Sequence, residues 1–377
     1  PSVVGDHRGA ELGPPDVQSE HRGHGDRRYR TPGSLPAPAT PPSNGPRWQN
    51  RAHMTTMDPT TTPAGPGRSF SAMFDSICSN IAVAVRGKDD VIRLTVTCLV
   101  AGGHLLIEDV PGVGKTTIAK ALARSVDGRF GRVQFTPDLL PSDVLGSSVW
   151  NQSSGAFEFR AGPVFHHLVL SDEINRASPK TQSALLEAMA EEQVTVDGTT
   201  YPLPRPFMVV ATQNPLEHQG TFPLPESQLD RFLMRLSVGY PDRVAETALL
   251  TETDHDDRLA GLGPVVSTED VLAMGAAAAG VFVSDALASY LVELADRSRR
   301  SGAFALGMSP RAALGLLGAA RVHAAAQGRT FVSPDDIKDL AVPVLAHRVL
   351  LATESQLRGV TAADAVADLL RTTPVPG

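Results

Sequence analysis

One short segment constrains this chain more than any other: Asp109–Thr117, which reads Asp-Val-Pro-Gly-Val-Gly-Lys-Thr-Thr. The apolar run at 104–108 before it is typical of a buried strand, and the apolar spacing from 118 to 126 after it is typical of a helix. A glycine-rich turn that joins a strand to a helix and ends in Lys-Thr is the pattern of a phosphate-binding loop. We therefore expect an α/β domain with a phosphate site at the start of a helix.

The residue types in this loop suit phosphate chemistry. Gly112 and Gly114 allow backbone N–H groups to curl around phosphate oxygens, and the helix start adds partial positive charge. Lys115 is expected to contact the β- and γ-phosphates of a nucleotide, and Thr116 to bind Mg²⁺. The strict form of the pattern has glycine where this chain has Asp109.

Two later apolar runs also end in polar residues. The run at 168–171 leads into Asp172 and Glu173, and the run at 207–212 leads into Gln213 and Asn214. Ligands of open parallel sheets bind at the carboxyl ends of the strands. Asp172 therefore suits the Mg²⁺ environment, Glu173 suits polarising an attacking water, and Asn214 suits orienting that water.

Two separated arginines complete the set of candidate residues. Arg231 belongs to a predicted helical turn at 225–232, and Arg311 follows Ser309 and Pro310, which are typical of a helix start. Arginines that converge on a nucleotide would neutralise the charge that develops during phosphoryl transfer.

These motifs together resemble the MoxR family of AAA+ ATPases over about residues 70–370. The resemblance rests on six stretches, in the family's order: 108–117 (EDVPGVGKTT), 171–177 (SDEINRA), 180–189 (KTQSALLEAM), 211–215 (ATQNP), 224–232 (LPESQLDRF) and 309–312 (SPRA). Loops of this family often begin Glu-Asp-x-Pro-Gly, so the aspartate at 109 fits it.

The resemblance implies a role for each matching residue. The residues it assigns to nucleotide binding are Val85, Gly87, Pro111, Gly112, Val113, Gly114, Lys115, Thr116 and Thr117. It makes Asp172 and Glu173 the Walker B pair, with Mg²⁺ held by Thr116 and Asp172. Asn214 is then sensor 1 and Arg311 is sensor 2, carried by the lid. Arg231 is the first candidate for a finger that acts across a subunit interface, and Arg176 is the second.

Composition and periodicity divide the chain into four parts. Residues 1–67 hold 12 of the 30 prolines and 9 of the 33 glycines, so we expect a disordered tail. One hypothesis for the part before Met54 is that it is upstream sequence read from a misplaced start, and the alternative is a native tail. The AAA+ core, with a mostly parallel central sheet, is expected at 68–245, and a linker at 246–263. A small all-α lid is expected at 264–377, with helices at 286–299, 310–327 and 334–345.

Two hairpins are expected within the core. One covers 149–159 and resembles the helix-2 insert of this class, with Trp150 and Phe157 either packing the hairpin or contacting partners. The other covers 193–201, where Asp197-Gly198 is a strong signal for a two-residue turn. It resembles the insert that precedes sensor 1.

The implied function is that of a Mg²⁺-dependent ATPase that forms a hexameric ring. Relatives of this family are chaperone-like, mature protein complexes or insert metals, and often act with a von Willebrand factor A-domain protein. No apolar run is long enough to span a membrane, no signal peptide is evident, and Cys78 and Cys98 cannot form a disulfide scaffold, so we expect a cytoplasmic protein.

The main alternative is a AAA+ motor or loader that acts on nucleic acid. The net charge of −7 argues against a uniformly basic surface. The first insert region, 136–164, carries only Arg160 against three acidic residues, and 193–201 contains no lysine or arginine. A GTPase lacks its Asn-Lys-x-Asp signature here, and a scaffold without hydrolysis does not explain Glu173 and Asn214.

Overall fold

The computed structural model describes residues 68–375, except for 216–219, 242, 244–245 and 248–254. The expectations for residues 1–67, and for part of the linker at 246–263, lie outside the described residues. All six stretches that carry the family resemblance lie within them.

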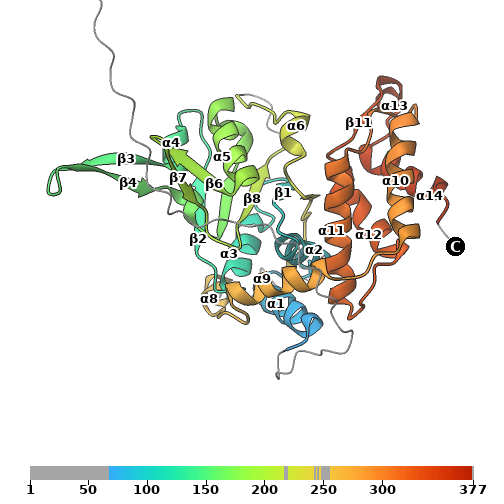
Figure 1. The fold of residues 1–377 in the computed structure, drawn as a ribbon, viewed down its shortest axis with the longest axis horizontal. Helices are drawn as coiled ribbons and strands as arrows, with labels where there is room; N and C mark the ends of the chain where they lie inside the picture. The colour runs from blue at the N-terminus through green and yellow to red at the C-terminus, as the bar shows by residue number, and fades with distance from the viewer. Residues whose placement is uncertain (1–67, 216–219, 242, 244–245, 248–254, 376–377) are drawn as a thin grey trace, which may run out of the picture. The chain divides into compact units, whose positions relative to one another are not determined.

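Five strands form the central sheet. They are β1 (Leu105–Glu108), β2 (Phe130–Gln134), β5 (Leu168–Asp172), β8 (Met208–Gln213) and β9 (Met234–Leu236). Their order across the sheet is β2-β5-β8-β1-β9, and each strand runs parallel to its neighbours. The predicted parallel α/β core is confirmed. The carboxyl ends of the strands meet at one edge, so the residues that follow β1, β5 and β8 lie along that edge (Figure 1).

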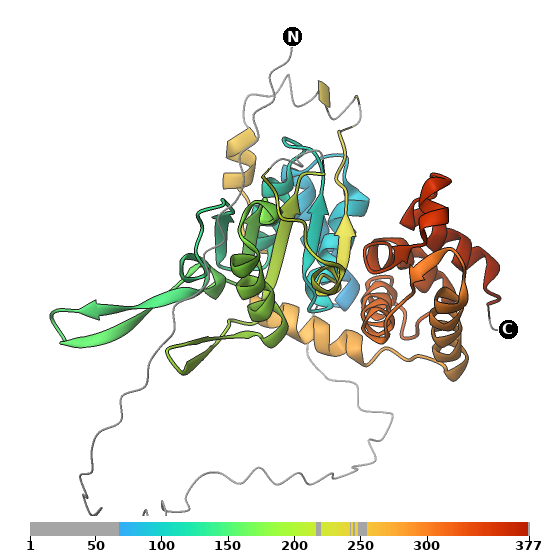
Figure 2. The same cartoon turned by 90° about the horizontal axis from the view of Figure 1, so that it is seen from above.

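Helices cover both faces of this sheet (Figure 2). Leu105 and Ile107 of β1 pack into a cluster with α1 (Phe70–Ala84), α2 (Asp89–Val100) and α3 (Lys115–Ser125). Leu106 packs on the other face, in a cluster with α4 (Pro141–Leu145) and α5 (Pro179–Glu191). Successive strand residues point to opposite faces, which explains why the strands read as continuous apolar runs.

Both predicted hairpins are present. The first pairs β3 (Gly146–Asn151) with β4 (Ala156–Ala161), and the second pairs β6 (Gln193–Val196) with β7 (Thr199–Pro202). In the second, Asp197 and Gly198 have φ values of 50° and 79°, as a two-residue turn with left-handed residues requires. The short helices are η1 (Pro163–Phe165), η2 (Ile174–Arg176), α6 (Glu226–Leu229) and α8 (His255–Ala260).

The carboxyl-terminal part is helical, as predicted. Its helices are α9 (Thr268–Ala279), α10 (Asp285–Arg300), α11 (Pro310–Ala326), α12 (Pro334–Leu345), α13 (Thr353–Leu357) and α14 (Ala362–Thr372). Ser309 and Ser333 cap α11 and α12, each followed by proline at the first helical position. One departure is a small antiparallel sheet of β10 (Phe304–Leu306) and β11 (Leu350–Leu351). Strands this short leave no periodic signal.

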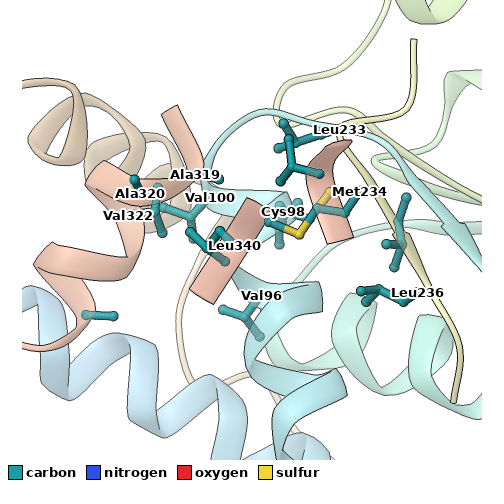
Figure 3. Packing of buried hydrophobic residues seen from close by; sticks show 14 of the residues in the cluster. Val96, Cys98, Val100, Leu233, Met234, Leu236, Ala319, Ala320, Val322 and Leu340 are labelled. Carbon is teal, nitrogen blue, oxygen red and sulfur yellow. The ribbon is translucent and has the colours of Figure 1, made fainter. Parts of the chain in front are cut away.

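This helical lid packs on the core through one continuous apolar cluster (Figure 3). Its members come from α2, the start and body of β9, α11 and α12: Val96, Cys98, Val100, Leu233, Met234, Leu236, Ala319, Ala320, Val322 and Leu340. Cys98 is fully buried, and burial raises the pKa of its thiol. The lid therefore contacts β9, the strand that begins three residues after Arg231. Across the described residues, no helix has both the length and the apolar character needed to cross a membrane.

Candidate active site

The loop after β1 forms an open cradle of backbone groups. Gly112 and Gly114 have φ values of 86° and 91°, which glycine adopts readily and other residues do not. A Cβ placed at either position would meet no atom within 4 Å, so the loop is open on that side. Gly114 is the N-cap of α3 and offers no side-chain acceptor, which leaves the first N–H groups of this helix available to phosphate oxygens.

Lys115 lies across this loop. Its Nζ donates to the Asp109 carbonyl oxygen at 2.6 Å. Burial lowers the pKa of Lys115, and the neighbouring Asp109, Asp172 and Glu173 carboxylates oppose that shift. The ammonium therefore lies in the loop near three carboxylates, and a phosphate bound there would compete for it.

Asp109 explains why this loop departs from the generic pattern. Its Oδ1 accepts from the Val110 N–H at 2.8 Å, and its Oδ2 accepts from the Ser237 hydroxyl at 2.9 Å and from the Gly239 N–H at 2.6 Å. Burial alone would raise the pKa of Asp109, but these hydrogen bonds outweigh it and hold the pKa below its usual range. Asp109 thus ties the phosphate loop to the chain after β9, which glycine could not do.

A cavity of about 270 Å³ lies beside the loop. It is lined by the α1–α2 turn, the glycine loop, and the segments near 241 and 258: Ala84, Val85, Arg86, Lys88, Gly112, Val113, Gly114, Thr117, Pro241, Arg258 and Leu259. Val85, Val113 and Thr117 are therefore brought together as predicted candidates for nucleotide binding. Four other candidates do not line the cavity: Gly87, Pro111, Lys115 and Thr116. Gly87 lies in the turn before α2, with φ of 65°.

The two carboxylates predicted to form the Walker B pair lie at the end of β5: Asp172 is its last residue, and Glu173 follows it. Asp172 Oδ1 accepts from the Thr212 hydroxyl at 2.6 Å, and the same hydroxyl accepts from the Glu173 N–H at 3.0 Å. Glu173 has φ of 57° and ψ of 49°, a left-handed conformation that is uncommon for a residue other than glycine and that clusters at functional sites. Thr212, on the neighbouring strand β8, therefore holds the Asp172 carboxylate and the Glu173 backbone, a role that the sequence did not indicate.

Two residues of β2 also belong to this site, although the sequence analysis did not predict them. Arg132 pairs with Asp172 Oδ2 at 2.8 Å, and Gln134 Nε2 donates to Glu173 Oε2 at 2.9 Å. Gln134 lies opposite Asp172 in the parallel pairing of β2 with β5. The available signal was alternation along β2, where Arg132 and Gln134 are exposed between buried positions.

The same edge suits a hydrated magnesium ion. Thr116 lies in the first turn of α3, and Asn214 is buried just beyond β8, next to β5. Within the described ranges, no group of three or more His, Cys, Asp or Glu side chains could hold a metal. Mg²⁺ characteristically uses one or two protein ligands together with water and phosphate. Asp172 and Thr116 fit that description.

The arginine candidates lie elsewhere. Arg231 and Arg311 line a cavity of about 460 Å³ together with Arg348. This cavity adjoins Gly103 and His104, which precede β1, so it lies at the amino edge of the sheet, opposite the phosphate loop. The two arginines are brought together, but not at the glycine loop of their own chain. Arg176, the second finger candidate, pairs through Nε with the Glu173 carboxylate at 3.2 Å.

Comparison with known proteins shows which family the chain belongs to. The family model described as ATPase family associated with various cellular activities (AAA) matches residues 104–234, and the AAA lid domain model matches 296–369. Chaperone MoxR1 of Mycobacterium tuberculosis is 39% identical, over 77% of this chain and 79% of its own length. The chain belongs to the MoxR family of AAA+ ATPases.

Two further proteins extend the comparison for this MoxR-family chain. Protein YeaC of Bacillus subtilis is 47% identical, over 77% of this chain and 91% of its own length. The crystal structure of an inferred ATPase from Cytophaga hutchinsonii has a TM-score of 0.77 and 37% identity, and the match covers 82% of this chain and 96% of that one. The likeness therefore includes both the core and the lid.

Two buried histidines of this MoxR-family fold are uncharged at neutral pH. His104 Nδ1 accepts from the Val209 N–H at 3.1 Å, and its Nε2 lies 3.1 Å from the Met189 carbonyl oxygen. His347 Nε2 lies 2.9 Å from the Phe232 carbonyl oxygen. Burial lowers the pKa of His104 to about 4 and the pKa of His347 to about 3, although each carbonyl contact acts in the opposite direction.

These two pKa values predict acid sensitivity. In the unfolded chain both imidazoles return to a pKa near 6.5. Between about pH 6.5 and 4 the unfolded chain therefore binds more protons than the folded chain, and the free energy of unfolding falls as the pH is lowered. We expect a loss of about 1.4 kcal/mol per pH unit for each histidine. Urea unfolding at pH 7, 6 and 5 measures it. In a His347→Gln variant, the free energy of unfolding should fall less steeply with decreasing pH, by the contribution of one histidine. Equal pH dependence in the two proteins would contradict the lowered pKa of His347.

Proposed function

We propose that this chain is a Mg²⁺-dependent ATPase that works as a ring, and that it uses ATP hydrolysis to remodel protein complexes. One observation supports the proposal most: the glycine loop after β1 and the carboxylates Asp172 and Glu173 at the end of β5 lie at the same edge of the sheet. A loop that cradles phosphates beside a carboxylate in a strained backbone conformation is suited to hydrolysing a nucleotide.

Each side chain at this edge has one proposed task. Lys115 leaves the Asp109 carbonyl and binds the β- and γ-phosphates. Thr116 and Asp172 hold Mg²⁺, which neutralises phosphate charge when it is bound. Glu173 takes a proton from the attacking water, and Asn214 keeps that water in line. The nucleotide base occupies the cavity beside Val85.

The position of Arg231 and Arg311 supports a ring. The four residues of β1, at about 3.3 Å each, separate the two edges of the sheet by about 13 Å. An arginine at the amino edge is therefore poorly placed to reach a phosphate bound at the carboxyl edge of its own subunit. We propose that both arginines act on the ATP of the neighbouring subunit, in a closed, six-membered assembly.

The hairpin of β3 and β4 is the proposed contact for protein clients. Trp150 and Phe157 lie directly opposite each other across it, with ring centroids 5.2 Å apart, and remain 51% and 70% exposed. Exposed aromatic pairs of this kind are common at protein-binding surfaces. A von Willebrand factor A-domain partner, a role in metal insertion and a cytoplasmic location are the finer parts of the proposal, and they rest on the family resemblance.

The first test is a change at Lys115. Lys115→Ala removes the ammonium that would pair with the phosphates, so we expect ATP affinity to fall by about 10²-fold, the usual scale for a hydrogen bond to a charged group. Isothermal titration with a slowly hydrolysed ATP analogue measures it. Lys120→Ala, which removes the same charge from the same helix, is the matched control. Wild-type affinity in Lys115→Ala would refute the phosphate site.

A further inference from the structure

Two adjacent lid residues, His347 and Arg348, converge on one backbone atom of the core. The carbonyl oxygen of Phe232 accepts from Arg348 Nη2 at 2.8 Å and lies 2.9 Å from His347 Nε2. Both side chains are buried, with 4% and 8% of each residue exposed. Phe232 immediately follows Arg231, so the lid grips the chain one residue beyond the finger candidate.

The residue on the other side of Arg231 is held from the lid as well. Asp230 pairs with Arg348 Nε at 3.5 Å and with Arg311 Nη1 at 3.9 Å. The Ser309 hydroxyl, at the start of α11, lies 3.5 Å from Asp230 Oδ1. Arg231 itself donates through Nη1 to the Leu186 carbonyl of α5 at 2.7 Å. The residues on both sides of Arg231 are therefore bonded to the lid, while the Arg231 guanidinium is bonded to the core.

Stability alone is a poor explanation for Arg348. Burial lowers its pKa, and the attraction of Asp230 only partly offsets that cost. Within the described part of the chain, its Nε and Nη1 have no hydrogen-bond partner. An apolar side chain of similar size commonly stabilises a fold as well as a buried ion does, or better. Arg348 also lines the same cavity as Arg231 and Arg311, which points to a task at that cavity.

We propose that His347 and Arg348 are positioning residues that set the reach of Arg231 toward the ATP of the neighbouring subunit. The lid orientation in one subunit thereby controls hydrolysis in the next. This inference rests on the proposed function, in which Arg231 acts between subunits. The apolar cluster of α2, β9, α11 and α12 keeps the lid attached, and the polar grip on 230–232 transmits its orientation.

The test uses full-length subunits in mixed rings. Arg348→Met removes the guanidinium and keeps an apolar chain of similar length. We expect rings of this variant alone to lose on the order of 10²-fold in kcat, the scale of a misplaced catalytic group, with unchanged ATP affinity. Rings of Lys115→Ala alone should be inactive. Mixing the two should restore turnover, because about a quarter of the interfaces then pair an intact phosphate loop with an intact grip.

A parallel mixture separates the two proposals. Arg231→Ala subunits are mixed with Lys115→Ala subunits under the same conditions. Recovery in both mixtures supports both proposals. Recovery with Arg231→Ala but not with Arg348→Met overturns the positioning role and leaves the finger between subunits intact. Recovery in neither overturns both.

Two lid variants complete the design. Arg297→Met, which removes an arginine that pairs with Glu293 on the lid surface, is the matched control and should leave kcat unchanged. His347→Gln retains an N–H that can donate to the Phe232 carbonyl and should keep most of the turnover. Equal losses of kcat in Arg297→Met and Arg348→Met would show a general effect of lid changes and would overturn the proposal.

Discussion

Replacing Glu173 by glutamine is expected to leave ATP bound and to lower its turnover by about 10²- to 10⁴-fold, the usual contribution of a general base. Glutamine has the same shape and can still pair with Gln134, which donates to Glu173 at 2.9 Å. It cannot take a proton from water. The left-handed backbone of this residue and the hydrogen bond from its N–H to Thr212 do not involve the carboxylate, so the substitution leaves both in place.

The measurement has two parts, because the prediction separates binding from chemistry. Phosphate release at saturating ATP gives kcat, and equilibrium titration gives the affinity. Glu187→Gln, on the exposed face of α5, removes the same charge nearby and should behave as wild type. Normal phosphate release by the Glu173 variant would exclude this residue as the base.

A second large effect is expected for Arg231→Ala. An arginine finger contributes about 10³- to 10⁵-fold to the rate of phosphoryl transfer, and its loss should fall on kcat. ATP affinity should change little, because Arg231 lies at the amino edge of the sheet and the phosphate loop at the carboxyl edge. Single-turnover hydrolysis in rings that contain only this variant gives the rate of the chemical step directly.

Arg205→Ala is the matched control for this prediction. Arg205 is an exposed residue that pairs with Glu192 on the same side of the molecule, and its loss should leave the rate unchanged. If Arg231→Ala lowers the rate by less than about tenfold, the loss is too small for an arginine finger. In that case Arg311 would be the next candidate for the finger, because it lines the same cavity with a side chain that is 65% exposed.

The sequence was most informative where local chemistry decides the structure. Ser309-Pro310 and Ser333-Pro334 determine where α11 and α12 begin, because a capping hydroxyl and a proline at the first position act within one turn. The Asp197-Gly198 turn determines the second hairpin in the same way. The parallel core could be predicted because the three apolar runs recognised in the sequence each end in polar residues.

What the sequence could not supply depends on the spatial order of distant segments. Arg132 and Gln134 reach Asp172 and Glu173 because β2 pairs with β5, and the paired residues Phe130 and Leu168 are 38 positions apart in the sequence. Strand β9 has three residues, too few for a periodic signal. Arg311 could be assigned to a helix start from the sequence. The edge of the sheet near which it lies is determined by the packing of the lid on α2 and β9.

The hairpin of β3 and β4, the proposed client contact, also gives the molecule its own optical probe. The chain has two tryptophans, and Trp150, on β3, is the one within the described residues. Its indole is half exposed and lies edge-on to Phe157, so a protein that covers this pair replaces water around the ring. Indole emission shifts to shorter wavelength when water is excluded. Client capture can therefore be followed without attaching a label, with Trp48 replaced by phenylalanine to remove the second signal.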